Sequence, residues 1–149
     1  MSEIISSPSS TDQELIARQT VDSALTVHSS LGPGLLESVY EHCLAAELES
    51  RSIPIRLQVV VPIVYRRIHI DTGFRIDILA GGPVVIEIKA VEKILQIHEA
   101  QLLTYLKLSG HPLGLLINFN AAPDPARHQT IHHVAPFCFS VFVATLSCL

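Results

Sequence analysis

Residues 73–90 read Gly-Phe-Arg-Ile-Asp-Ile-Leu-Ala-Gly-Gly-Pro-Val-Val-Ile-Glu-Ile-Lys-Ala, and this stretch decides the fold. Two runs rich in β-branched residues flank a Gly-Gly-Pro turn, which is the pattern of a β-hairpin. With the loop centred on the second of these glycines, Asp77 faces Glu87. One face, with Ile76 and Ile78, is then apolar throughout, and the other carries all four charges of the hairpin: Arg75, Asp77, Glu87 and Lys89. A register one residue away would scatter these charges over both faces, so the pattern favours this one.

The favoured register has one unfavourable feature, because Asp77 and Glu87 stand directly opposite each other. The Cβ atoms of such a pair lie about 4.5–5.5 Å apart, and like charges at that distance destabilise a sheet. Two explanations are open. In one, Asp77 pairs diagonally with Lys89, and Glu87 with Arg75, on a solvated face. In the other, the two carboxylates hold a divalent cation, with Lys89 alongside. The hairpin alone does not choose between them.

Length and composition predict one compact domain. The chain has 149 residues, of which 48% are hydrophobic and 16% charged, as in globular rather than disordered proteins. The net charge of −4 excludes a strong, non-specific electrostatic attraction for nucleic acid, so any such contact must be local or bridged by metal. Three cysteines without a Cys-x-x-Cys spacing indicate neither a disulfide framework nor a zinc site.

The two ends of the chain differ from its centre. Residues 1–10 are rich in Ser and lack the basic and apolar regions of a signal peptide, which predicts a short disordered lead-in. The apolar tail from Phe137 to Leu149 is shorter than the roughly 20 residues of a membrane-spanning helix. We therefore expect a cytoplasmic protein without membrane contact, with its main domain at residues 11–120 and a C-terminal extension at 121–149.

The remaining periodicities give the order of the elements. Helices are expected over Asp12–Ser29, Leu35–Ser50 and Val91–Ser109, the first with a capping box at Thr11–Glu14. Strands are expected over Ile55–Tyr65, from Ile68 towards Ala80, in the second half of the hairpin, and over Leu113–Phe119. Pro62 marks an edge, a bulge or a break. The order α-α-β-β-β-α-β predicts an α/β fold with a mixed sheet flanked by helices.

Two helical segments bring further polar residues towards the hairpin. His98, Gln101 and Tyr105 share one helix face, where they could orient a substrate or the strand carboxylates. The alternative is that Tyr105 packs in the core and Gln101 bonds a loop. Glu37 and Tyr40 share a face at the start of the second helix, where an acid is favoured by the helix dipole alone. A third acid near a cation would complete an oxygen ligand set for magnesium or manganese.

Taken in order, these motifs resemble one known family. They are Gly34-x-x-Glu37-x-x-Tyr40, Arg75-x-Asp77, Glu87-Ile88-Lys89, His98-x-x-Gln101-x-x-x-Tyr105 and Gly114-Leu115-Leu116-Ile117-Asn118-Phe119. Each is weak alone, but the ordered set resembles the GxxExxY family of the PD-(D/E)XK nuclease-like superfamily from about Leu15 to Asn120. After that point the chain departs from the family pattern.

The resemblance implies a restriction-endonuclease-like fold and a set of residue roles. Asp77 and Glu87 would be metal ligands, Lys89 the catalytic lysine, and Glu37 an acid contributed to the metal by the preceding helix. Gln101 would belong to the catalytic set, matching with Tyr105 the Gln-x-x-x-Tyr element of related nucleases. The candidate substrate-binding residues are Tyr40, Arg75, His98 and Tyr105.

Two functional hypotheses follow. The first is a nuclease that hydrolyses phosphodiester bonds in DNA or RNA with Mg²⁺ or Mn²⁺. The second is a non-catalytic binding or assembly module on the same fold, favoured by the net negative charge and the scarcity of clustered Lys and Arg. Under the second hypothesis the apolar tail Phe137–Leu149 is a candidate self-association segment of a homo-oligomer.

Overall fold

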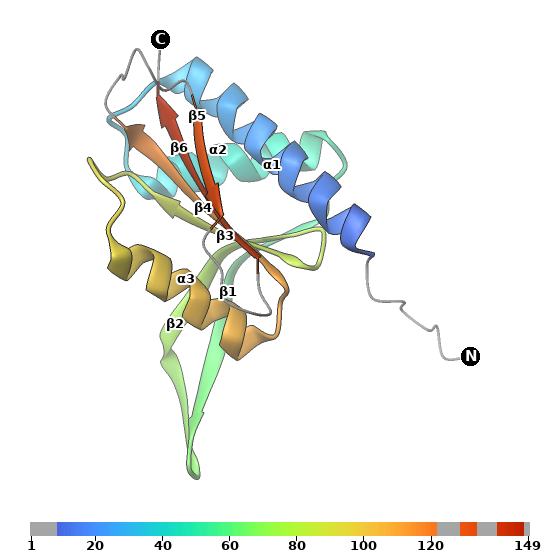
Figure 1. Ribbon diagram of the computed structural model, residues 1–149, viewed down its shortest axis with the longest axis vertical. Coiled ribbons are helices and arrows are strands. Elements are labelled where there is room, and N and C mark those ends of the chain that lie inside the picture. The colour runs from blue at the N-terminus through green and yellow to red at the C-terminus, as the bar shows by residue number, and fades with distance from the viewer. Residues whose placement is uncertain (1–8, 122–128, 134–139, 148–149) are drawn as a thin grey trace.

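The computed structural model describes residues 9–121, 129–133 and 140–147, which form one sheet with helices packed on both of its faces (Figure 1). The helices are α1 (Ser10–Leu31), α2 (Glu37–Ser50) and α3 (Gln96–Ser109). The strands are β1 (Ile55–Tyr65), β2 (Ile68–Ala80), β3 (Val84–Lys89), β4 (Leu113–Ala121), β5 (Gln129–His133) and β6 (Ser140–Ser147). Among the described residues, no helix combines the length and the apolar character needed to cross a bilayer.

The sheet is mixed, with the strand order β1-β2-β3-β4-β6-β5. Strands β1, β2 and β3 are antiparallel neighbours, whereas β3, β4 and β6 are parallel and β5 returns antiparallel to β6. The expected order α-α-β-β-β-α-β and the mixed sheet of a restriction-endonuclease-like fold are confirmed. The two added strands come from the C-terminal extension, and β6 contributes buried Ala144 and Leu146 to the core. Residues 137–139, at the start of the apolar tail, lie outside the described residues.

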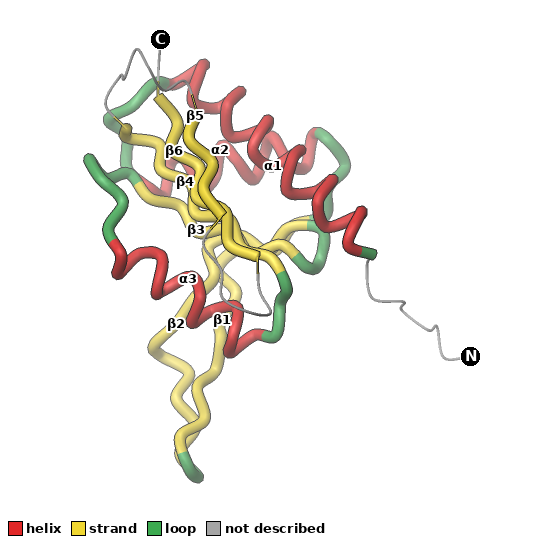
Figure 2. The backbone as a smooth tube through the Cα atoms, viewed as in Figure 1, coloured by secondary structure: helices red, strands yellow, loops and turns green. Residues whose placement is uncertain are grey.

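Helices cover both faces of the sheet, so the central strands are buried on both sides (Figure 2). One cluster of apolar side chains joins α1 and α2 to the sheet and includes Ile78 and Ile86. The other joins α3 to the sheet and includes Ile76 and Leu79. Ile76 and Ile78 therefore belong to different layers, and the prediction that they share one apolar face is wrong. The chain changes face at Asp77, between them.

The predicted hairpin register is confirmed close to the turn, where Ile78 pairs with Ile86 and Leu79 with Val85. Backbone pairing between β2 and β3 is confined to residues 78–80 and 84–86, so Asp77 and Glu87 are not a paired cross-strand couple as predicted. The Asp77 carboxylate itself accepts the next hydrogen bond, from the Ile88 N–H. A side chain thus takes the place of the strand backbone, and β2 and β3 separate from this point.

Two helix starts differ from the sequence-based expectation. Helix α1 is capped by Ser9, whose hydroxyl accepts from the Asp12 N–H while the Asp12 carboxylate accepts from the Ser9 N–H, so the capping box lies two residues before the predicted one. Helix α3 begins at Gln96 rather than at Val91. Val91 is held by hydrogen bonds to the side chain of Asn118 on β4, which keeps its backbone out of the helix.

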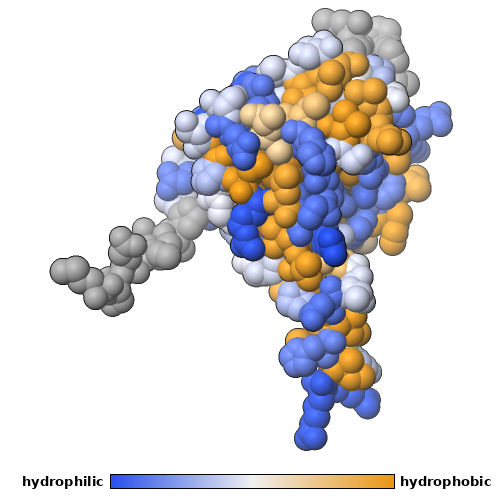
Figure 3. Space-filling view, turned by 180° about the vertical axis from the view of Figure 1, so that it is seen from behind, coloured by the Kyte–Doolittle hydropathy of each residue, from blue (hydrophilic) through white to orange (hydrophobic). Residues whose placement is uncertain are grey.

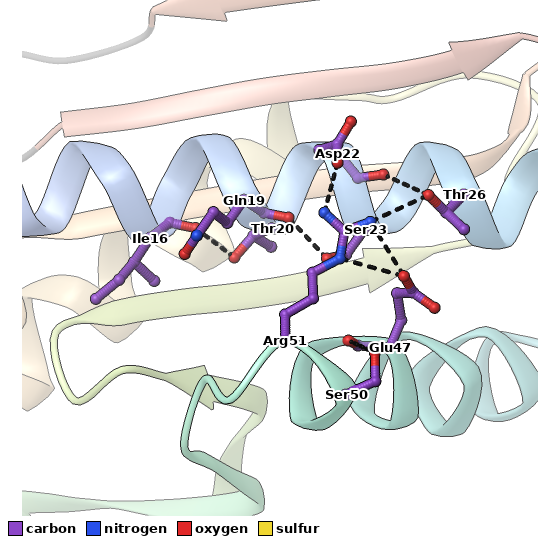
Figure 4. A network of polar contacts seen from close by, with 9 residues as sticks. All are labelled: Ile16, Gln19, Thr20, Asp22, Ser23, Thr26, Glu47, Ser50 and Arg51. Atoms are coloured by element: carbon purple, nitrogen blue, oxygen red, sulfur yellow. Dashed lines mark hydrogen bonds and ion pairs between the residues drawn. The ribbon is translucent and has the colours of Figure 1, made fainter.

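Helices α1 and α2 are joined by polar contacts around Arg51 (Figure 4). Its guanidinium forms ion pairs with Asp22 of α1 and Glu47 of α2. These groups are partly exposed, so the pairs contribute modestly to stability and mainly fix how the helices lie against each other. The buried hydroxyls of Thr20 and Ser23 donate to carbonyls one turn earlier in α1, which satisfies them without a partner on another element.

The turn between α1 and α2 is fixed from inside by Tyr40. Its hydroxyl donates to the Gly32 carbonyl and accepts from the Leu35 N–H, while its ring stacks on Phe119 at 4.4 Å between centroids. The Tyr40 side chain is fully buried, so its polar group serves the fold.

We expect Tyr40→Phe to lower the free energy of unfolding by about 1–2 kcal/mol, because the stacked ring remains while a partly buried carbonyl and N–H lose their partner. Urea unfolding followed by circular dichroism measures this change. Tyr65→Phe is the matched control, because Tyr65 is 59% exposed, and it should change stability by less than about 0.5 kcal/mol. Equal effects of the two substitutions would contradict the role assigned to the Tyr40 hydroxyl.

Candidate active site

Three charged side chains meet where β2 and β3 separate. Asp77 lies on β2, and Glu87 and Lys89 lie on the same side of β3, two residues apart. The Lys89 ammonium donates to Glu87 Oε1 at 3.0 Å, and Asp77 Oδ2 accepts from the Ile88 N–H at 2.8 Å. Because β2 changes the face it presents at Asp77, the carboxylate of this residue lies beside the end of β3, where it bonds Ile88.

The solvated diagonal pairing considered above is not observed. Glu87 is only 3% exposed, and it pairs with the lysine of its own strand. Arg75 is exposed and forms no ion pair with any described residue. The second carboxylate oxygen of Glu87, Oε2, is buried and has no hydrogen-bond partner among the described residues. Leaving a buried acceptor unsatisfied is costly, and that cost calls for an explanation.

Burial and neighbouring charges raise the pKa values of both carboxylates, Asp77 and Glu87, so each binds a positive charge more readily. Burial raises the pKa of Glu87 to about 7, the Asp77 charge acts in the same direction, and Lys89 opposes both. Burial also raises the pKa of Asp77, against the Ile88 hydrogen bond. For Lys89, burial acts against the charge, but Glu87, Glu37 and Asp77 together outweigh it and raise the pKa above its ordinary value. The lysine is therefore cationic at neutral pH, while Glu87 is held between its two protonation states.

Helix α2 adds two acids on one face. Glu37, in the first turn, accepts from the Ala90 N–H at 3.2 Å and so reaches the end of β3. Glu41, one turn later, was not singled out from the sequence. It is 8% exposed, its two oxygens accept from the Gln58 amide at 2.8 and 3.0 Å, and its charge raises the pKa of Asp77. The i, i+4 spacing of Glu37 and Glu41 is the signal that could have found it.

Gln58 itself marks an irregularity in β1. Its φ of +50° lies in the left-handed region, which is uncommon for a residue other than glycine. It stands at the one position between Leu57 and Val59 that has no partner on β2, opposite Asp77. The register is the same on both sides of Gln58, so the pairing is interrupted at this position without an inserted residue. This irregularity has no sequence signature.

Helix α3 supplies a neutral pair beside the carboxylates. Gln101 donates to the Tyr105 hydroxyl at 2.7 Å, and Tyr105 is 3% exposed, with its ring edge-on to Phe74. Burial raises the pKa of Tyr105 and the nearby Glu87 charge acts in the same direction, so the phenol stays protonated. Tyr105 thus belongs to the core, as one alternative held, and it also lies beside the site.

The other candidates serve local structure or point to solvent. The His98 ring nitrogen Nδ1 accepts from the Leu95 N–H at 3.0 Å, which satisfies a backbone donor at the start of α3. Tyr40 is bonded within the α1–α2 turn, and Arg75 projects from β2 beside the site.

Asn118 fixes the strand end that carries Lys89. Asn118 is fully buried and pairs with Lys89 across the parallel β3–β4 ladder. Its side chain accepts from the Val91 and Asn120 N–H groups and donates to the Val91 carbonyl at 2.7 Å. The connection that follows Lys89 is therefore tied to β4, although the sequence indicated only that Asn118 belonged to a motif.

The donor set fits a small divalent cation held by few protein ligands. Among the described residues, no three His, Cys, Asp or Glu side chains are grouped closely enough to hold a metal ion, so the expected trio of Asp77, Glu87 and Glu37 is not assembled in advance. Magnesium, however, is usually held by one or two carboxylates and keeps several waters. The partnerless Glu87 Oε2 beside Asp77 meets that smaller requirement.

The mixed sheet and this site define an α/β protein of the restriction-endonuclease-like class. A family model described as the PD-(D/E)XK nuclease superfamily matches residues 14–130, well over half of the chain. The chain therefore belongs to the PD-(D/E)XK nuclease superfamily. A comparison with curated proteins gives no match.

Glu87→Gln should change the pH dependence of stability. Because the folded-state pKa of Glu87 is about 7 against 4.5 ordinarily, the folded protein holds an extra proton between these values, so it loses stability as pH rises from 4.5 to 7 and no further above that. The free energy of unfolding of the variant, relative to that of the wild type, should therefore increase by up to about 3 kcal/mol between pH 5 and pH 8. Urea unfolding without divalent ions measures this, with Glu49→Gln at the exposed end of α2 as control. A stability difference that stays constant with pH would contradict the assignment.

We expect Asn118→Ala to lower the free energy of unfolding by about 2–4 kcal/mol, because the Val91 N–H and carbonyl lose their partners. Asn120→Ala, at the neighbouring half-buried position, should cost less than about 1 kcal/mol. Thermal and urea unfolding of the two variants check the difference, and an equal loss in both would refute the bridging role of Asn118.

Proposed function

We propose that this protein is a divalent-metal-dependent nuclease that hydrolyses phosphodiester bonds, with Asp77 and Glu87 as the protein ligands of Mg²⁺ or Mn²⁺. The observation that carries the proposal is the buried, partnerless Glu87 Oε2 beside the Asp77 carboxylate. A buried carboxylate pair is costly unless a positive charge compensates it, and Lys89 occupies only one of the four oxygens. Membership in the superfamily supports the same reaction class.

The chain's own side chains supply definite functions in such a reaction. A bound metal would acidify a water molecule and polarise a phosphate oxygen. Lys89, held cationic by Glu87, is placed to stabilise negative charge that develops on the phosphate. Gln101 and Tyr105 offer neutral hydrogen bonds at the edge of the site, and their pairing at 2.7 Å orients both groups.

Glu37 has a secondary place in this proposal. Its carboxylate bonds the Ala90 N–H, so it fixes the end of β3 and leaves one oxygen for a metal-bound water. The ordered motifs from Gly34 to Phe119 also support placement in the GxxExxY family within the superfamily.

Metal binding is the first test. Mg²⁺ and Mn²⁺ should raise the melting temperature of the wild type, because a ligand that binds only the folded state stabilises it. Asp77→Asn should lose most of this increase, whereas Asp71→Asn, an exposed position on the same strand, should retain it. The proposal would be contradicted if neither Mg²⁺ nor Mn²⁺ changed the melting temperature of the wild type or gave a heat of binding by titration calorimetry.

Cleavage is tested on plasmid DNA, single-stranded DNA and RNA with each metal. Lys89→Met should lower the cleavage rate by at least about a hundredfold while it keeps metal binding, because the lysine acts on the reacting phosphate and not on the metal. Asp77→Asn should lose both. Metal binding without cleavage of any substrate would favour the alternative of a binding module that keeps the nuclease fold.

A further inference from the structure

The charges of the chain are segregated along its sequence. Residues 56–76 contain four of its 10 Lys and Arg residues and one of its 14 Asp and Glu residues, so this segment carries +3 while the whole chain carries −4. The remainder therefore carries −7. The basic residues are Arg56, Arg66, Arg67 and Arg75, and the acid is Asp71. Such a basic segment on an acidic protein marks a local contact with a polyanion.

The outer part of this segment forms an arm that projects from the body of the protein (Figure 3), while Arg56 and Arg75 lie on the strands that lead to it. We define the arm as residues 62–73, the outer part of the β1–β2 hairpin, in which every residue is exposed except half-buried Ile63. The tip is hydrophilic, with Arg66 and Arg67 in the turn and apolar side chains just behind it. Neither arginine forms an ion pair with a described residue.

The apolar residues behind the tip lie mainly on one face of the arm. Tyr65 pairs with Ile68 and Ile63 with Ile70, which places the four side chains together. Tyr65 and Ile68 are each 59% exposed, and the Arg66 guanidinium lies 5.5 Å from the Tyr65 ring centroid. An isolated two-stranded ribbon is marginally stable in water, so this face predicts a partner that covers it.

The arm starts at the candidate active site. Strand β2 runs from Asp77 past Arg75 to the tip, and Phe74 at its base packs edge-on against Tyr105. Ten residues separate Asp77 from Arg67, and at about 3.3 Å per residue they span at most about 33 Å. That length is close to one turn of B-form DNA, about 34 Å. Guanidinium groups thus extend from the reacting position to about one helical turn away.

We propose that the arm is a duplex-DNA contact, in which Arg66 and Arg67 bind phosphates or base edges about one turn from the cleaved bond and Tyr65 and Ile68 pack in the groove. This inference rests on the proposed nuclease function, because it assigns that site a double-stranded substrate. The B-form major groove admits a two-stranded ribbon, whereas the corresponding groove of duplex RNA is deep and narrow.

The binding test uses a fluorescent DNA duplex of about 30 base pairs, full-length protein and EDTA, so that it does not depend on metal or cleavage. Arg66→Ala/Arg67→Ala should weaken affinity at least about tenfold and reduce the salt dependence of log Kd by about two. Arg18→Ala/Lys107→Ala is the matched control, because it removes two exposed charges from α1 and α3. Its affinity should stay within about twofold, and circular dichroism should show both variants folded.

The remaining outcomes separate this inference from the proposed function. Cleavage of duplex DNA by the wild type, with equal binding by the arm and control variants, would overturn the arm contact and leave the nuclease standing. Arm-dependent duplex binding without metal-dependent cleavage would support the arm contact and overturn the nuclease function. Equal arm-dependent binding to duplex RNA would overturn the groove assignment. A dimer that Tyr65→Ser/Ile68→Ser dissociates, with DNA affinity unchanged, would instead identify a second copy as the partner.

Discussion

The hydrogen bond from the Ile88 N–H to the Asp77 carboxylate is the interaction on which the site and the arm both depend. In a continuous ladder that N–H would bond a carbonyl of β2, and the two strands would stay paired to their ends. A side-chain acceptor satisfies the donor but ends the ladder after Ile78. Strand β3 can then turn towards α3, while β2 continues with β1 alone. The replacement of one backbone acceptor by a side chain therefore separates β2 from β3 beside the carboxylates. It also leaves the outer part of the β1–β2 hairpin without β3 as a neighbour.

The burial of both sheet faces determines how charged groups behave at this position. A carboxylate on a solvated edge would titrate normally, but helices on both sides leave Glu87 only 3% exposed. The fold offsets part of the resulting cost with Lys89 and leaves one oxygen without a partner. Sites with chemical roles commonly keep such local instability, because a perfectly satisfied carboxylate has less to gain from a bound cation or substrate.

The sequence predicted the features that follow from periodicity and turn chemistry. Alternation around the Gly-Gly-Pro turn placed Ile78 opposite Ile86 correctly, and Arg66-Arg67 was correctly expected at a turn. It failed where a side chain replaces a backbone partner. The face change at Asp77, the late start of α3 beside Asn118 and the left-handed Gln58 each arise from contacts between distant segments. Local patterns do not reveal such contacts. The sequence therefore indicated Asp77, Glu87 and Lys89, which lie together in the structure, but missed their neighbours Glu41 and Gln58.

The position of Gln58 explains why the site can keep its geometry under repulsion. The Glu41 charge raises the pKa of Asp77, and the Asp77 charge raises the pKa of Glu87, so like charges repel one another at this site. The Gln58 amide binds both oxygens of Glu41 and thereby ties α2 to the edge strand β1 across this region. A neutral donor achieves this without the positive charge that would compete with a cation for the carboxylates. The left-handed backbone at Gln58 occurs at the residue that makes this tie, which is consistent with strain retained for a function.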